Sequence, residues 1–256
     1  MILEDHATVP YLKAFKSGKI KRGLGIGCIL DDYFLFKKGD FNMFLGLDNV
    51  GKTNFILWYL TALSKKHGKR WCIWSGENRP GQLKRDIIQM WTGETIKDLN
   101  EYLFYHDEVS KYFKFVDNKK LYNHKELLEL FKKEDCDGCL IDPYTGKTMF
   151  IAMHPQTEAA RRVFPHDHQL NGHIQPPRKA DCEGGQVFPN RVDNFITLHR
   201  LISHDKLWMM TEVHVQKIKD KETGGKPTML GQQLRFDYNG GLGFTIGGIN
   251  VLKQKQ

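Results

Sequence analysis

The 256-residue sequence lacks any apolar run long enough to cross a lipid bilayer, for which a helix needs about 20 residues. Its opening residues, MILEDHATVPYLKAFKSGKIKRG, also lack the unbroken apolar core of a secretory signal peptide. The five cysteines are an odd number without framework spacing, which argues against a disulfide scaffold and for a reducing compartment. We therefore expect a cytoplasmic protein with no membrane partner.

A recognisable metal-binding motif is missing as well. Cys136 and Cys139 form one C-x-x-C pair, but the second pair that a structural zinc site usually needs is absent. We interpret the pair as two cysteines that flank a turn into a buried strand. Several histidines follow, but their spacing relative to Cys182 fits no compact set of ligands. These histidines are His154, His166, His168 and His173.

Basic residues outnumber acidic ones, which gives a formal net charge of +8. A basic surface can serve nucleic acid, a nucleotide or solubility alone, so the charge leaves these alternatives open. The hydrophobic share of 40% and the charged share of 27% are typical of a globular domain, and the length fits one large α/β domain.

The most informative stretch is 41–63, FNMFLGLDNVGKTNFILWYLTAL, which contains the spacing G-x-x-x-x-G-K-[ST]. Glycines let the backbone N–H groups surround a phosphate, Lys52 adds positive charge, and the Thr53 hydroxyl can hold Mg²⁺. An apolar run precedes the motif, and apolar residues at helical spacing follow it, so strand, loop and helix stand in the required order. The residues predicted to surround the phosphates are Gly46, Asp48, Asn49, Val50, Gly51, Lys52, Thr53 and Asn54.

Two acidic residues follow predicted strands. Glu77 follows the predicted strand in WCIWSG. Ligands of parallel sheets lie at the carboxyl ends of the strands, so we expect Glu77 to face the same crevice as Lys52. That position suits a general base for water. The alternative is a surface carboxylate that caps the helix beginning near Pro80. Asp142 ends the strand GCLID, where an acid can position Mg²⁺; the alternative is a turn residue before Pro143.

The next strand, within 147–154, follows too closely. Only 143–146 separate it from the strand that ends at Asp142, whereas a parallel crossover needs a dozen or more residues. Two alternatives remain open from the residues alone. Either the two strands form an antiparallel hairpin, or a segment is missing from the sequence after Tyr144.

The other segments have weaker patterns. Apolar spacing predicts helices near 83–91 and 96–105, and Asn123 with Glu126 predicts a capping box for a helix over 124–133. The polar stretch 166–190 reads as a long loop, followed by strands within 195–201, 207–219 and 234–238. We expect the first forty residues to be an arm or lead-in strand beside the phosphate loop. The glycine-rich tail should end in a hairpin or an edge strand.

Taken in order, these motifs resemble the ATPase domain of hexameric replicative helicases of the DnaB and Twinkle type, which has a RecA-like fold. The motifs that carry the resemblance are GLDNVGKT, WSGEN, LIDPY, AMHP, and FITLHR with HVQKIKDKETGGKPT, and they cover about 23–236. The resemblance implies a P-loop NTPase of the α/β class, with a mostly parallel sheet, helices on both faces and a β-rich C-terminal end. It divides the chain into an arm (1–40), the ATPase domain (41–238) and a tail (239–256).

The resemblance also implies roles for individual residues, with ATP and Mg²⁺ as the cofactors. It makes Glu77 the base for the attacking water, Asp142 the metal-positioning acid and His154 the sensor of the terminal phosphate. Lys217 and Lys219 match a Lys-x-Arg pair that acts on the nucleotide of the neighbouring subunit. Lysine stands here where the family has arginine, so whether Lys219 or Arg200 is the finger that acts in trans stays open.

The implied partners are single-stranded DNA and further copies of the chain in a hexameric ring, with a primase or loader as another candidate. The predicted DNA contacts are Arg161, Arg162, Arg178 and Lys179. In the family a helix joins the LIDPY-like and AMHP-like strands, which favours a missing segment after Tyr144. Two other functions fit the same fold: a recombination or repair ATPase that forms filaments, and a nucleotide-binding module that recruits partners without hydrolysis.

Overall fold

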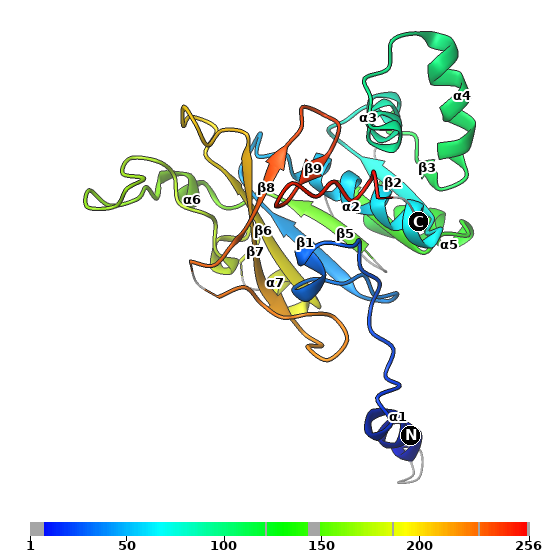
Figure 1. Ribbon diagram of the computed structural model, residues 1–256, viewed down its shortest axis with the longest axis horizontal. Helices are drawn as coiled ribbons and strands as arrows, with labels where there is room; N and C mark the ends of the chain where they lie inside the picture. Colours follow the sequence, from blue (N-terminus) through cyan, green and yellow to red (C-terminus); the bar gives the residue numbers. More distant parts are fainter. Residues whose placement is uncertain (1–7, 121, 143–148, 186, 230, 255–256) are drawn as a thin grey trace.

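A nine-stranded mixed sheet forms the centre of the computed structural model, which describes residues 8–120, 122–142, 149–185, 187–229 and 231–254 (Figure 1). The strand order is β3-β2-β4-β5-β1-β6-β7-β8-β9. The first six strands in this order pair in parallel and the last three pair antiparallel, which confirms the predicted fold class and its β-rich C-terminal end. The strands are β1 (Phe41–Leu45), β2 (Trp71–Ser75), β3 (Phe113–Phe115), β4 (Gly138–Asp142), β5 (Met149–Met153), β6 (Asn194–Arg200), β7 (Met210–Ile218), β8 (Leu234–Tyr238) and β9 (Phe244–Thr245).

The helices begin and end at residues that suit those positions. Asn123 and Glu126 form the predicted capping box of α5. Asp98 accepts a hydrogen bond from the backbone N–H of Glu101, so α4 begins and ends later than the apolar spacing predicted. The helices are α1 (Val9–Lys16), α2 (Lys52–His67), α3 (Pro80–Thr92), α4 (Leu99–Ser110), α5 (His124–Lys133), α6 (Thr157–Arg161) and α7 (Val187–Arg191). In the described part of the chain, none of them is long and apolar enough to span a membrane.

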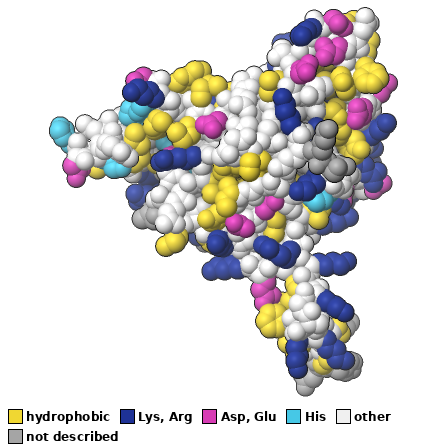
Figure 2. Space-filling model, in the orientation of Figure 1, with side chains coloured by type: hydrophobic (Ala, Val, Ile, Leu, Met, Phe, Trp, Pro, Cys, Tyr) yellow, Lys and Arg dark blue, Asp and Glu magenta, His cyan; other side chains and the backbone are white. Residues whose placement is uncertain are grey.

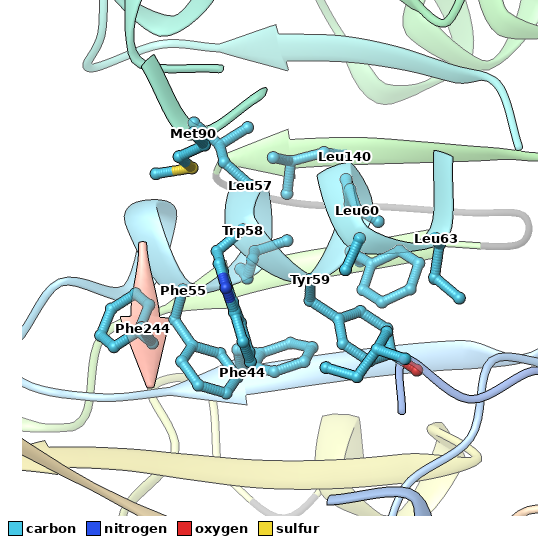
Figure 3. Close-up of a cluster of buried hydrophobic side chains, with 14 of the residues drawn as sticks. Phe44, Phe55, Leu57, Trp58, Tyr59, Leu60, Leu63, Met90, Leu140 and Phe244 are labelled. Atoms are coloured by element: carbon cyan, nitrogen blue, oxygen red, sulfur yellow. The ribbon is translucent and has the colours of Figure 1, made fainter. Parts of the chain in front are cut away.

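Helix α2 is the centre of the hydrophobic core (Figure 3). Its aromatic side chains contact strands from both ends of the chain: the Phe55 ring centroid lies 6.4 Å from that of Phe44 in β1 and 5.2 Å from that of Phe244 in β9. The same core contains Phe34 before β1 and Leu252 after β9. Core packing therefore crosses both predicted domain boundaries, which remain predictions.

Strands β4 and β5 pair in parallel, with Leu140 opposite Phe150 and Ile141 opposite Ile151. The antiparallel hairpin alternative is therefore wrong. That alternative was based on the short link between the two strands. Their parallel direction instead agrees with their burial on both faces of the sheet. Residues 143–148 lie outside the described residues, so the missing segment after Tyr144 stays a prediction.

The first described element is a helix that projects from the body of the molecule, where a lead-in strand had been one prediction (Figure 1). Its apolar side chains Val9, Leu12 and Phe15 recur at helical spacing and are all exposed, at 39%, 59% and 59%. The Tyr11 hydroxyl donates a 2.6 Å hydrogen bond to Glu222. Figure 2 shows basic and apolar side chains side by side on this projection.

Candidate active site

A cavity of about 800 Å³ lies at the carboxyl ends of β1, β2, β5 and β6. This is the edge at which ligands of parallel α/β sheets are bound. The cavity brings together six of the eight predicted phosphate-loop residues, all except Gly46 and the buried Val50, with Glu77, His154 and Arg200. Its lining residues are Asp48, Asn49, Gly51, Lys52, Thr53, Asn54, Glu77, Asn78, Gln82, Leu83, Arg85, Asp86, Gln89, His154, Arg200, Tyr238, Gly240 and Gly241.

The phosphate loop has the backbone that its glycines predict. A Cβ atom on Gly46 would lie 2.7 Å from the carbonyl oxygen of Leu198 in β6 and 2.8 Å from Val50 Cγ2, so only glycine fits this close approach. Gly51 adopts a left-handed conformation with φ 85° and is the N-cap of α2. The N-terminus of α2, with its partial positive charge, therefore lies at the cavity, as a phosphate site requires.

Lys52 is only 7% exposed and lies over the loop. Its Nζ donates hydrogen bonds to the carbonyl oxygens of Gly46 at 2.8 Å and Leu47 at 2.9 Å. A buried ammonium group needs such acceptors, and phosphate oxygens are stronger ones. The side chain is therefore placed to transfer from loop carbonyls to an incoming phosphate.

His154 connects two acidic residues across the mouth of the cavity. Its Nδ1 lies 2.7 Å from Asp48 in the phosphate loop, and its Nε2 lies 3.4 Å from Glu77 at the end of β2. Glu77 is 54% exposed and lies before the N-cap of α3, which is Arg79, so it is not the helix cap of the alternative interpretation. The geometry suits a carboxylate that faces water and is oriented by a histidine.

Arg200 and Tyr238 form the far wall of the cavity. The guanidinium carbon of Arg200 lies 5.3 Å from the centroid of the Tyr238 ring, and the Tyr238 hydroxyl is 3.4 Å from the amide nitrogen of Asn54. Burial lowers the pKa of Arg200, and its Nε has no hydrogen-bond partner among the described residues. Tyr238 was not predicted. It ends β8, which runs parallel to β6, so Tyr238 and Arg200 lie at the same side of the sheet. The position of Tyr238 at the end of a predicted strand was the available signal.

The lysines predicted to act in trans lie near the amino end of β6, opposite the end that holds the cavity. Lys217 is paired with Phe195 near the start of β6, whereas Arg200 ends that strand beside the cavity. Lys217 Nζ donates to three backbone carbonyls at the end of α7 and just after it, and Lys219 forms a 2.7 Å ion pair with Asp193. The chain therefore brings neither lysine to its own cavity, and their role toward a neighbouring subunit stays a prediction.

The predicted magnesium ligands are described only in part. The Asp142 backbone pairs with Ser75 at the end of β2, which places it at the edge of the sheet that holds the cavity, but its side chain lies outside the described residues. Thr53 lines the cavity. No group of three or more His, Cys, Asp or Glu side chains within the described ranges could hold a metal ion. The Thr53 hydroxyl fits Mg²⁺ because this ion commonly keeps waters and phosphate oxygens as its other ligands.

The predicted DNA-contacting residues lie on the segment that covers the other face of the sheet. Arg161 and Arg178 are exposed, and Lys179 is half-buried. Arg162 instead forms a 2.5 Å ion pair with Asp181, so its charge is used within the segment. Hydrogen bonding to Asp181 raises the pKa of Arg162, in keeping with a structural role.

No family model matches the sequence, and no curated protein matches it either. The solved structures that share its architecture include the following two. One is an ATPase domain that is 14% identical with a TM-score of 0.69, and the match covers 94% of this chain and 98% of that one. The other is a DnaB-like replicative helicase, described with its interactions with primase, that is 15% identical with a TM-score of 0.66; the match covers 95% of this chain and 67% of that one.

The chain has the fold of a DnaB-type, RecA-like ATPase domain. The predicted resemblance is thereby confirmed at the level of the fold. At identities this low, the likeness to DnaB-type domains carries no residue roles, so those of Glu77, Asp142, His154 and Lys219 rest on the chain's own geometry or remain predictions.

Proposed function

We propose that this protein is a Mg²⁺- and ATP-dependent motor that binds single-stranded DNA and acts as a helicase or translocase. One observation carries the proposal: Lys52, Glu77 and His154, from three separate elements, converge on a cavity at the N-terminus of α2. Charge for the phosphates, a base for water and a group that orients the base are the parts that phosphoryl transfer requires.

Each part has a distinct task. The phosphate loop and Lys52 bind the phosphates, and Glu77 takes a proton from the attacking water while His154 holds its carboxylate in place. Arg200 and Tyr238 offer a flat cationic and aromatic surface to the rest of the nucleotide. Bound Mg²⁺, for which Thr53 and Asp142 are the candidate ligands, supplies neutralisation of the phosphate charge.

We assign DNA binding to the basic segment, residues 161–179, on the other face of the sheet. Arg161 and Arg178 are exposed there, and Lys179 is half-buried. Contacts of these cations with phosphates would be weakened by salt and largely independent of sequence.

A ring of identical subunits, with a hexamer as the expected size, completes the proposal. The support is unburied apolar surface: α1 exposes Leu12 and Phe15, and α4 exposes Leu103 and Phe104 at 52% and 71%. Such surface is typical of subunit interfaces. A cytoplasmic location and a primase or loader as a further partner belong to the same proposal; a DnaB-like neighbour is described with primase.

The test is ATP hydrolysis by the full chain with and without single-stranded DNA. We expect DNA to stimulate hydrolysis and Lys52→Ala to abolish it. Glu77→Gln should keep nucleotide binding but lose about 10²- to 10⁴-fold in kcat, since it removes the base alone. Absence of hydrolysis under both conditions would refute a motor function.

A further inference from the structure

A second cavity, of about 790 Å³, lies on the face of the sheet that points away from α2. In β7, Val213 and Val215 pack into the core around α2, so the alternating side chains Glu212, His214 and Gln216 face the opposite way. The segment 164–180 lies over them and forms another side of the cavity. Its lining residues are Phe164, His168, Gln169, Leu170, Gln175, Pro176, Pro177, Arg178, Lys179, Ala180, Glu212, His214, Val215, Gln216, Thr228, Met229, Gly231, Gln233 and Arg235.

The covering segment is fixed to the sheet by specific bonds. The Gln216 side chain accepts a 2.7 Å hydrogen bond from the backbone N–H of Lys179 and donates to the Pro177 carbonyl at 3.0 Å and to Thr197 Oγ1 at 2.8 Å. Arg162 joins the two ends of the segment through Asp181. The cavity is therefore a formed site of the size that holds small organic groups.

A carboxylate lies at the base of the cavity. Glu212 is 9% exposed; its Oε1 accepts a 2.8 Å hydrogen bond from Gln233, and its Oε2 lies 3.5 Å from His214 Nε2. Burial raises the pKa of Glu212, but the neighbouring His214 and Gln233 outweigh this effect and lower it to about 2. The group is thus an ionised acceptor with capacity for further donors.

Flat and apolar groups form one wall of the cavity. The rings of Phe164 and His168 stack with centroids 4.3 Å apart and an angle of 12° between them. Pro176 and Pro177 extend this wall, and Met229, which is 70% exposed, lies at the cavity lining as well. The wall suits a planar ring, because aromatic faces favour stacking.

Three cations, Arg178, Lys179 and Arg235, also line the cavity, and Arg235 Nε lies 3.5 Å from Glu212 Oε1. A planar ring with hydrogen-bond donors, attached to a negatively charged backbone, matches this distribution. An apolar peptide side chain matches it less well, since it offers no further donor to Glu212 and no negative charge to the cations that line the cavity.

We propose that this cavity binds a nucleobase that is unstacked from the single strand, with guanine preferred because two of its N–H groups point along one edge toward Glu212. The inference rests on the proposed function, since the strand whose phosphates meet Arg178 supplies the base. Stacking against Phe164 would contribute for any base, whereas Glu212 would select for guanine.

The test measures binding of the full chain to three labelled oligonucleotides: oligo(dT), the same strand with one dG, and the same strand with one abasic position. We expect the dG strand to bind about tenfold more tightly than the abasic one, with oligo(dT) between them. Glu212→Gln should remove the preference for dG over dT, and Phe164→Ala should reduce the affinity for base-containing strands toward that for the abasic strand.

Glu158→Gln is the matched control, since it removes an exposed carboxylate outside the cavity and should keep the preference. Thermal melting shows whether Glu212→Gln is folded; if it is not, Phe164→Ala provides the result. Equal binding of all three strands by the unmodified chain overturns this inference alone, while failure to bind any strand overturns the proposed function with it.

A free nucleoside is the other source of the same chemistry. With the first cavity saturated by ADP, guanosine is added to the unmodified chain and to Glu212→Gln. Weak guanosine binding, together with a clear dG preference in the strand, supports the inference. Glu212-dependent guanosine binding without any dG preference overturns it.

Discussion

Asp48 and His154 lie 2.7 Å apart, and this contact joins the predicted phosphate loop to the end of β5. The other ring nitrogen of His154 faces Glu77. Lys52 Nζ also lies 3.4 Å from the Nδ1 that faces Asp48. We therefore expect that a phosphate which displaces Asp48 from this contact changes how His154 holds Glu77, so that nucleotide binding and the position of Glu77 are coupled.

Replacing His154 should therefore affect turnover more than nucleotide binding. We expect His154→Ala to lower kcat for ATP about 10²-fold and to change KM by less than about threefold, since it removes a group that orients the base. Steady-state kinetics without DNA measure both constants. His166→Ala, on the exposed part of the basic segment, is the control and should leave them unchanged; a large KM increase in His154→Ala would instead indicate a binding role.

Tyr238 should contribute to nucleotide binding through its ring. We expect Tyr238→Ala to raise KM for ATP about three- to tenfold, which corresponds to the loss of one stacking contact. Tyr238→Phe keeps the ring and loses only the 3.4 Å contact with Asn54, so its KM should stay close to that of the unmodified chain. Equal defects in both variants would show that the hydroxyl, and not the ring, is what matters.

The parts of the fold that depend on local sequence were predictable. The phosphate loop and α2 follow each other within 41–63, so one stretch contains the strand, the turn and the helix. The pairing of β4 with β5 was not, because it depends on which strands share the buried centre of the sheet. Helix α1 was not predicted, although Pro10 marks its first turn. Its apolar residues face no core, so the segment resembles an arm without a fixed structure.

The site was predictable where each residue ends a strand of the parallel set. Glu77 and His154 follow β2 and β5, and the rule for parallel sheets places them beside Lys52. Tyr238 escaped this rule because it ends a strand of the antiparallel part, whose direction depends on the number of reversals before it. The partnership of Arg162 with Asp181 joins residues that no local pattern links.

Arg200 lines the cavity of its own chain, whereas Lys219 lies at the opposite edge of the sheet. Subunit mixing should separate them. In a mixture of equal amounts of Lys52→Ala and Lys219→Ala chains, random assembly leaves about a quarter of the interfaces with both groups intact if Lys219 acts in trans. We therefore expect ATPase activity to return on mixing.

The corresponding mixture of Lys52→Ala and Arg200→Ala chains should stay inactive. If Arg200 acts in the cavity of its own chain, every cavity in this mixture lacks either Lys52 or Arg200. ATP hydrolysis is measured before and after subunit exchange, and the two single variants alone are the controls. Recovery with Arg200→Ala in place of Lys219→Ala would show that Arg200 is the residue that acts across the interface.

The exposed face of α1 should support assembly. We expect Leu12→Glu combined with Phe15→Glu to reduce the mass in solution from a ring toward a monomer and to lower ATP hydrolysis in parallel, because charged groups disfavour apolar burial. Light scattering measures the mass. Lys13→Glu with Lys16→Glu changes the charge of the same helix by more and spares its apolar residues; if this control dissociates equally, electrostatics and not the apolar face hold the ring.

His199 makes the stability of the fold depend on pH. It is 1% exposed, and burial, which outweighs the attraction of Glu212, lowers its pKa to about 4 from an ordinary value of 6.5. The unfolded chain therefore binds a proton more readily, so stability is complete above pH 6.5 and falls as the pH drops toward 4, by about 3 kcal/mol at most. Urea unfolding across this range should show the loss. The free energy of unfolding of His199→Gln should depend less on pH, whereas His166→Gln, at an exposed position, should keep the pH dependence of the unmodified chain. An unchanged pH dependence in His199→Gln would assign the loss of stability to other groups.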